Sequence, residues 1–178
     1  MASVSEPLVV WINGAFGVGK TSVAEELVTL LPDAILFDPE LLGTLLRIVI
    51  PAREQTDDFQ DIPAWRHLSR DAVVSLSRTR RGAVVVPMTL VDGTYFAEIV
   101  GGIRAQGVRL VHVALVAPVE VITGRLCSRS DAEQWAVERI ERCVAELADA
   151  CFAEQIDAAS ATPRELAVQI ERLVEGAG

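Results

Sequence analysis

Lysine is almost absent from this chain of 178 residues, because fifteen of its sixteen basic residues are arginines and only Lys20 is a lysine. Positive charge is scarce altogether, and the acidic residues leave a net charge of −9. Nucleic acids and anionic membranes attract basic surfaces, so neither is expected as the main partner of this chain. Anionic ligands must instead be bound by a few groups placed locally.

Cysteines are few, and long apolar runs are missing. Cys127, Cys143 and Cys151 have no CxxC spacing, which argues against a disulfide framework or a zinc site. Although 51% of the residues are hydrophobic, no run approaches the roughly eighteen residues of a membrane span. The start of the chain lacks the blocks of a signal peptide. We therefore expect a cytoplasmic protein without an integral membrane segment, folded as one domain over residues 1–178.

What the chain does contain is the pattern GxxxxGK[ST], placed between an apolar run at 8–12 and a helix-forming stretch at 21–27. In a phosphate-binding loop the glycines let backbone N–H groups turn toward phosphate oxygens, the lysine reaches the β and γ phosphates, and the hydroxyl holds Mg²⁺. The following helix points its N-terminus at the phosphates. The residues that we expect to bind nucleotide here are Gly14, Ala15, Phe16, Gly17, Val18, Gly19, Lys20, Thr21 and Ser22.

Strand-like and helix-like segments alternate along the chain. Apolar runs predict strands at 8–12, 34–37, 83–88 and 108–117, and a weaker one at 154–158. Helices are predicted between them, and this alternation indicates a three-layer α/β domain with a five-stranded parallel sheet. The helix at 40–50 carries Leu41, Leu45 and Ile48 at helical spacing. In the helix at 63–81 the predicted core stripe is Trp65, Leu68, Ala72 and Leu76.

Ligands of open parallel sheets bind at the carboxyl ends of the strands, where Asp38 follows the second strand. Its carboxylate suits proton removal from a hydroxyl group or the ordering of Mg²⁺. The alternative is a helix cap before Pro39. The third strand ends in Met88-Thr89 without an acidic residue, unlike the strands of mechanical ATPases, and this favours a small-molecule kinase.

Arg125 and Arg129 share one helix face before a polar break, where a mobile lid at about 125–135 would bring them to the transferred phosphate. The alternative is a solvated surface helix. His112 interrupts an apolar strand and is expected in the core, while His67 is equally compatible with a pocket or with solvent.

Five stretches together resemble the tunicamycin-resistance ATP-binding proteins, a family of P-loop kinase-like proteins. They are Trp11-Ile12-Asn13-Gly14-Ala15-Phe16-Gly17, Phe37-Asp38-Pro39-Glu40, Asp58-Phe59-Gln60 with Pro63 and Trp65-Arg66, Val86-Pro87-Met88-Thr89, and Arg139-Ile140 with Arg142-Cys143-Val144. The resemblance implies a sheet of order 2-3-1-4-5, binding of ATP with Mg²⁺, and a role in resistance to a nucleoside antibiotic. Asp38 would be the base or, with Thr21, organise Mg²⁺. Arg125 and Arg129 would act from the lid, and Thr162-Pro163 would lie beside the adenine.

Three functions stay open at this point. The first is a kinase of a sugar-bearing nucleoside antibiotic, the second an ATP-dependent protein that only sequesters the drug, and the third a kinase of an ordinary small metabolite. For the first, the acceptor pocket would comprise Asp38, Arg47, Phe59, Gln60, Trp65, Arg66, Met88 and Thr89. The residues leave the acceptor hydroxyl and the oligomeric state open, a homodimer included.

Overall fold

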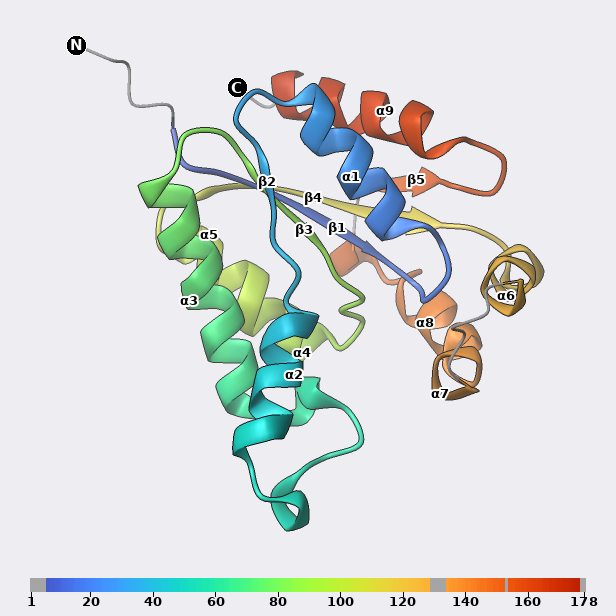
Figure 1. Ribbon diagram of the computed structural model, residues 1–178. Helices are drawn as coiled ribbons and strands as arrows, with labels where there is room; N and C mark the ends of the chain where they lie inside the picture. The colour runs from blue at the N-terminus through green and yellow to red at the C-terminus, as the bar shows by residue number, and fades with distance from the viewer. Residues whose placement is uncertain (1–5, 129–133, 153, 177–178) are drawn as a thin grey trace.

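The computed structural model describes residues 6–128, 134–152 and 154–176. Its strands are β1 (Leu8–Gly14), β2 (Ile35–Leu36), β3 (Val84–Pro87), β4 (Arg109–Val116) and β5 (Gln155–Asp157). They form one parallel sheet in the order β2-β3-β1-β4-β5 (Figure 1). Both the five-stranded parallel sheet and the strand order implied by the resemblance are confirmed.

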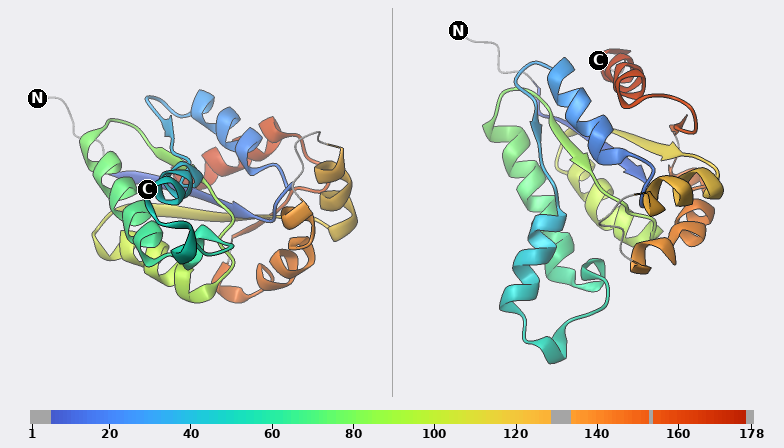
Figure 2. Two further views of the ribbon diagram at one scale, coloured as in Figure 1. Left: turned by 60° about the horizontal axis from the view of Figure 1, so that its bottom comes forward. Right: turned by 45° about the vertical axis from the view of Figure 1, so that its right-hand side comes forward.

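Helices lie on both faces of the sheet (Figures 1 and 2). The bounds of the longer helices are α1 (Lys20–Leu30), α2 (Glu40–Val49), α3 (Pro63–Thr79), α6 (Val119–Cys127), α8 (Ile140–Glu146) and α9 (Pro163–Gly176). The shorter elements are η1 (Ala52–Glu54), η2 (Phe59–Asp61), α4 (Gly93–Phe96), the π-helical turn η3 (Ala97–Gly101), α5 (Gly102–Ala105), α7 (Gln134–Val137) and η4 (Ala150–Phe152).

Two apolar cores explain why the central strands are continuous apolar runs. On one face α1 and α9 pack on the sheet around Val10, Ile12 and Leu27, and on the other α3 and the α4–α5 segment pack around Val9 and Trp11. Alternate residues of β1 thus enter opposite cores, so both faces of the strand need apolar side chains. No helix among the described residues combines the length and apolar character that crossing a membrane requires.

Helix α2 and the segment that joins it to α3 extend away from the sheet (Figures 1 and 2). On α2, Leu41, Leu45 and Ile48 are 68%, 50% and 77% exposed, so their helical spacing does not mark a buried face. The buried positions are Gly43 and Leu46. A Cβ atom on Gly43 would come within 2.7 Å of the Phe59 ring, and this close approach to η2 turns the other face of α2 to solvent.

The predicted core stripe of α3 is also partly wrong. Leu68 is 44% exposed, whereas Arg66 and Ser77, which are not part of the predicted stripe, are buried. Arg66 can be buried because Glu98 and the Gln60 carbonyl accept hydrogen bonds from its guanidinium, as described below. The helical segment over 93–105 contains the π-helical turn η3, and a break at 138–139 separates α7 from α8.

Candidate functional site

The phosphate loop between β1 and α1 has the backbone that its glycines allow. Gly14, Gly17 and Gly19 have φ angles of +149°, +81° and +108°, a region that other residues rarely adopt. A Cβ atom on Gly14 would lie 2.7 Å from the Val18 side chain, and one on Gly17 would lie 2.9 Å from Leu126. At Gly19 a Cβ atom would meet nothing within 4 Å. The loop therefore packs tightly against the protein on one side and is open at Gly19.

The N-terminus of α1 is available to an anion. No side chain among the described residues forms a capping hydrogen bond with this helix, and its first turn contains no acidic residue. The side chains of Thr21 and Ser22 in that turn are exposed. Unpaired N–H groups and the helix dipole attract negative charge at such an end, so this terminus fits a phosphate group.

Lys20 folds back over the loop. Its Nζ atom donates hydrogen bonds to the carbonyl oxygens of Gly14 and Ala15, both at 3.0 Å. Burial lowers the pKa of Lys20 to about 8, although the negative charges of Glu40 and Asp38 act in the opposite direction. A negative partner stabilises the charged form of such an ammonium group, and a polyphosphate carries more negative charge than the two carbonyl oxygens.

Two buried side chains hold the loop to the end of β3. The Asn13 carboxamide accepts hydrogen bonds from the N–H groups of Gly14 (2.8 Å) and Leu90 (2.9 Å) and donates one to the Leu90 carbonyl (2.7 Å). The Thr89 hydroxyl donates to the Gly14 carbonyl at 2.8 Å. The segment after β3 therefore fixes the position of the first loop glycine.

A polar cavity of about 230 Å³ adjoins the loop. It is lined by Phe16, Asp57, Asp58, Gln60, Asp61, Thr89, Val91, Asp92, Tyr95, Arg139, Arg142 and Cys143. Burial raises the pKa of Asp58, and the nearby charge of Asp61 adds to this effect, whereas a hydrogen bond from Gln60 N–H and the charge of Arg139 oppose it. The cavity thus combines carboxylates from the η2 and α4 regions with two arginines from the region of α8.

Of the eight predicted acceptor residues, Gln60 and Thr89 line this cavity and the other six do not. Gln60 donates from Nε2 to the Thr89 carbonyl at 2.9 Å, which joins η2 to the end of β3. Met88 is 1% exposed and lies in the core. Arg47 is exposed and donates to the Asp57 carbonyl at 3.1 Å. Its guanidinium also lies 5.8 Å from the Phe59 ring.

Trp65 and Arg66 support the cavity from behind. The Trp65 indole donates to the Pro39 carbonyl at 2.9 Å, which anchors the start of α2. Arg66 donates to the Gln60 carbonyl and to Glu98, both at 2.6 Å, and its guanidinium lies 4.1 Å from the Tyr95 ring. Since Gln60 and Tyr95 both line the cavity, Arg66 determines its shape without lining it.

Asp38 caps the start of α2, which was the structural alternative to a catalytic role. Its Oδ1 atom accepts a hydrogen bond from the Glu40 N–H at 2.9 Å, at the start of α2. The carboxylate does not line the polar cavity, but its charge acts on Lys20, as does that of Glu40. Capping and an action beside the phosphate loop are therefore compatible for this residue.

Arg125 connects three segments instead of pointing freely from a lid. Its guanidinium donates to the carbonyls of Ala158 (2.9 Å) and Ala159 (2.8 Å) after β5 and, at 3.4 Å, to Val18 in the phosphate loop. Arg129 lies outside the described residues. Thr162 precedes Pro163 and caps α9, because its hydroxyl oxygen accepts a hydrogen bond from the Glu165 N–H at 3.3 Å. In return, the N–H and the hydroxyl of Thr162 donate to the Glu165 carboxylate, both at 2.8 Å. His112 is buried against the Phe96 ring.

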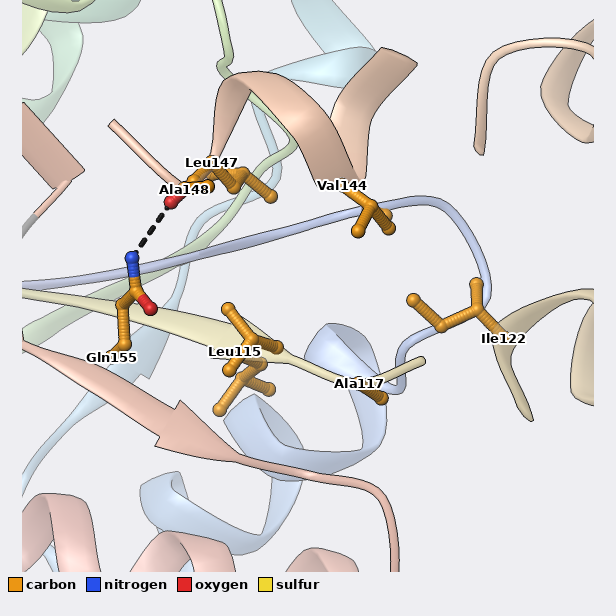
Figure 3. Close-up of a pocket in the computed structure, with 9 residues that line it drawn as sticks. Leu115, Ala117, Ile122, Val144, Leu147, Ala148 and Gln155 are labelled. Atoms are coloured by element: carbon orange, nitrogen blue, oxygen red, sulfur yellow. Dashed lines mark hydrogen bonds between the residues drawn. The ribbon is translucent and has the colours of Figure 1, made fainter. Parts of the chain in front are cut away.

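A second cavity, apolar and of about 170 Å³, lies between β4 and α8 (Figure 3). Figure 3 shows the side chains of Leu115, Ala117, Ile122 and Val144 around it. Its polar side chain, Gln155, donates to the Leu147 carbonyl at 2.8 Å. Because aliphatic groups surround it, this space does not suit a charged or highly hydroxylated ligand.

Sequence reasoning did not assign the cavity residues Arg139, Arg142, Cys143, Asp92 and Tyr95 to the site. The first three belong to a stretch that carried the family resemblance, and this was the available signal. Nothing in the local sequence distinguishes Asp92 from a helix cap, which it also is, since it accepts hydrogen bonds from the N–H groups of Thr94 and Tyr95.

Comparisons with known proteins agree with this geometry. The family model described as an AAA domain matches residues 9–153. The structure of the Deinococcus radiodurans tunicamycin resistance protein is similar to this chain, with 34% identity and a TM-score of 0.81 over 95% of each chain. None of the curated protein sequences compared with the chain gave a significant match.

Two more distant structures share the fold. A gluconokinase from Sinorhizobium meliloti 1021 has 20% identity and a TM-score of 0.66, over 96% of this chain and 95% of its own. The Mycobacterium tuberculosis APS kinase, in complex with AMPPNP and APS, has 16% identity and a TM-score of 0.62, over 96% of this chain and 98% of its own.

Proposed function

Since the chain belongs to the AAA domain family and is related over nearly its whole length to a tunicamycin resistance protein, we propose that it is an ATP-dependent kinase of a nucleoside antibiotic such as tunicamycin. The observation that carries the proposal is the polar cavity beside the phosphate loop. Phe16 of the loop and Thr89, which holds the loop, both line that cavity. A hydroxyl group of a ligand there would lie next to the phosphates.

The loop residues would bind the nucleotide. Backbone N–H groups of Gly14 to Thr21 surround the phosphates, and Lys20 exchanges its two carbonyl partners for phosphate oxygens. ATP with Mg²⁺ supplies the phosphoryl group, and the metal neutralises part of its charge. The exposed Thr21 hydroxyl is a suitable oxygen donor for Mg²⁺, and the Asp38 carboxylate would reach the ion only through a water molecule if it acts as the base.

The adenine would lie where α6 meets the segment after β5. Arg125 ties these elements to the phosphate loop, and Thr162 and Pro163 follow on the same segment. Ser22 in the first turn of α1 completes the nucleotide-binding set. In this arrangement Arg125 orders the nucleotide site, and its interaction with phosphate would require it to leave its carbonyl partners.

In the transfer step, the Asp38 carboxylate, whose charge acts on Lys20, would take the proton from an acceptor hydroxyl that extends from the polar cavity toward the phosphate loop. The acceptor oxygen forms a bond to the γ-phosphorus, the bond from that phosphorus to the β–γ bridging oxygen breaks, and its electron pair leaves with ADP. Gln60 and Thr89 would orient the acceptor, and Arg47, Phe59, Trp65, Arg66 and Met88 would support them from behind.

The test is incubation with ATP, Mg²⁺ and tunicamycin, followed by mass spectrometry of the drug. We expect the mass gain of one phosphoryl group, its loss in Asp38→Asn, and nearly unchanged ATP affinity in that variant. Binding of ATP and drug without any mass gain would reject the kinase and favour sequestration. A panel of sugar acids and nucleosides, assayed by ADP release, separates a drug kinase from a kinase of an ordinary metabolite.

A further inference from the structure

Trp135 in α7 lies between the phosphate loop and the start of α8. Its ring meets the Phe16 ring edge to face, with centroids 5.2 Å apart and an interplanar angle of 72°. On Arg139, the central guanidinium carbon lies 4.0 Å from the Trp135 ring centroid, and Nη1 donates to the Trp135 carbonyl at 3.3 Å. One tryptophan thus contacts both a loop residue and an arginine of the polar cavity.

Phe16, which contacts Trp135, also lies near Lys20. Its ammonium nitrogen lies 5.7 Å from the Phe16 ring centroid, so Phe16 has a cationic neighbour and Trp135 around it. Phe16 and Arg139 also line one cavity, together with Arg142 and Cys143. Arg139 is therefore placed at the wall that the acceptor cavity shares with the phosphate loop, whereas the Arg125 guanidinium is occupied by backbone carbonyls.

We infer that Trp135 is a positioning residue, which holds the Arg139 guanidinium at the cavity wall so that it contacts the transferred phosphoryl group. The phosphoryl group in this statement rests on the proposed function. A guanidinium stacked on an aromatic ring keeps its N–H donors at its edge, and those of Arg139 that do not bond the Trp135 carbonyl suffice to match a pair of phosphate oxygens. A lysine at 139 would keep the charge but lose this planar geometry.

The indole ring, and not its N–H group, carries this role. Among the described residues the buried Nε1 atom of Trp135 has no hydrogen-bond partner, while both ring contacts are present. Phenylalanine at 135 keeps an aromatic face for Arg139 and for Phe16, and leucine does not. This difference separates positioning from simple filling of space.

The experiment compares binding of Mg²⁺-AMPPNP and Mg²⁺-ADP by calorimetry, because only the first carries a γ-phosphate. We expect Arg139→Ala to weaken AMPPNP binding about 10- to 100-fold, the range for a lost charge-assisted hydrogen bond, and to leave ADP binding unchanged. Trp135→Leu should weaken AMPPNP binding about 3- to 10-fold, and Trp135→Phe should restore most of it. Arg104→Ala, at an exposed position on α5, is the matched control and should bind both as the wild type does.

Thermal unfolding of every variant accompanies the binding data. Equal losses for both nucleotides in Trp135→Leu, with a lowered melting temperature, would show that Trp135 only fills space and would overturn the inference. So would wild-type AMPPNP affinity in Arg139→Ala. If the predicted discrimination is found but no acceptor is phosphorylated, the proposed kinase activity fails while the positioning role stands. A wild-type chain that binds neither nucleotide would overturn both.

Discussion

The Thr89 hydroxyl donates a hydrogen bond of 2.8 Å to the carbonyl oxygen of Gly14, the atom that also accepts one from Lys20. When Lys20 turns to a phosphate, Thr89 is left as the side-chain donor to this buried carbonyl. The residue after β3 therefore keeps the phosphate loop in place in the state that binds nucleotide.

Replacing Thr89 with valine tests this relationship. The two side chains have nearly the same shape, but valine leaves the carbonyl without its hydroxyl donor, which costs about 1–3 kcal/mol. We expect Thr89→Val to weaken ATP binding about tenfold. Without ATP, Lys20 still donates to the Gly14 carbonyl, so the variant should lower the free energy of unfolding by less than it does with ATP bound. Calorimetry and urea unfolding measure both quantities, and Thr89→Ser should behave as the wild type. Equal ATP affinities in the two variants would contradict the argument.

The lowered pKa of Lys20 predicts proton uptake on nucleotide binding. In the free protein burial holds this pKa at about 8, and bound phosphates raise it because they favour the charged form. Above pH 8 the complex therefore holds more protons than the free protein, and affinity falls by up to about tenfold per pH unit. Calorimetry at pH 9 in buffers of different ionisation heat measures the uptake. Lys20→Arg, which stays charged, should show none, and an uptake as large as in the wild type would assign the proton to another group.

Asn13 is predicted to be the main polar support of the loop. Its carboxamide makes three buried hydrogen bonds, so Asn13→Ala leaves backbone groups of Gly14 and Leu90 without partners. The expected loss is about 3 kcal/mol in the free energy of unfolding. The control Gln134→Ala removes an exposed side-chain contact of 3.2 Å with Glu138 and should cost less than about 0.5 kcal/mol. Similar losses in the two variants would be inconsistent with a structural role for Asn13.

Gly17 and Gly19 form a matched pair, since both have positive φ angles but different surroundings. Gly19→Ala adds backbone strain of about 1–2 kcal/mol and no close contact. Gly17→Ala adds the same strain and a contact of 2.9 Å with Leu126 of α6, which must move. We expect Gly17→Ala to lower the melting temperature more. The reverse order would mean that α6 does not pack on the loop in solution.

The exposed face of α2 gives a prediction about stability. Ile48→Gln should change the free energy of unfolding by less than about 0.5 kcal/mol, because Ile48 is 77% exposed. Leu46→Ala, two positions earlier, should cost about 2–5 kcal/mol, because Leu46 is 7% exposed. Denaturant unfolding compares the two, and a large loss in Ile48→Gln would show that this face is covered in solution.

The roles of some site residues can be predicted from the local sequence, and those of others cannot. The loop from Gly14 to Thr21 is one contiguous stretch, and its glycines and lysine together are typical of phosphate binding. The sequence motif therefore predicts the conformation of the loop. For Asp38 the sequence leaves capping and catalysis open, and the structure shows the cap. Leu41 and Ile48 were misleading because periodicity marks an apolar face but not whether anything covers it.

By itself, then, the sequence determined the alternation of strands and helices, hence the parallel sheet, and the phosphate loop at the end of β1. Local hydrogen bonding and hydrophobic periodicity depend on residues a few positions apart, so a short segment of sequence is enough to predict them. Only the tertiary structure decided that Thr89 contacts the loop, that Arg139 lines a cavity together with Phe16, and that Arg125 joins the loop to the end of β5. Thr89 lies 75 positions from Gly14, and Arg125 lies 33 positions from Ala158. Local sequence cannot choose such distant partners, because they depend on how the helices pack at the carboxyl edge of the sheet.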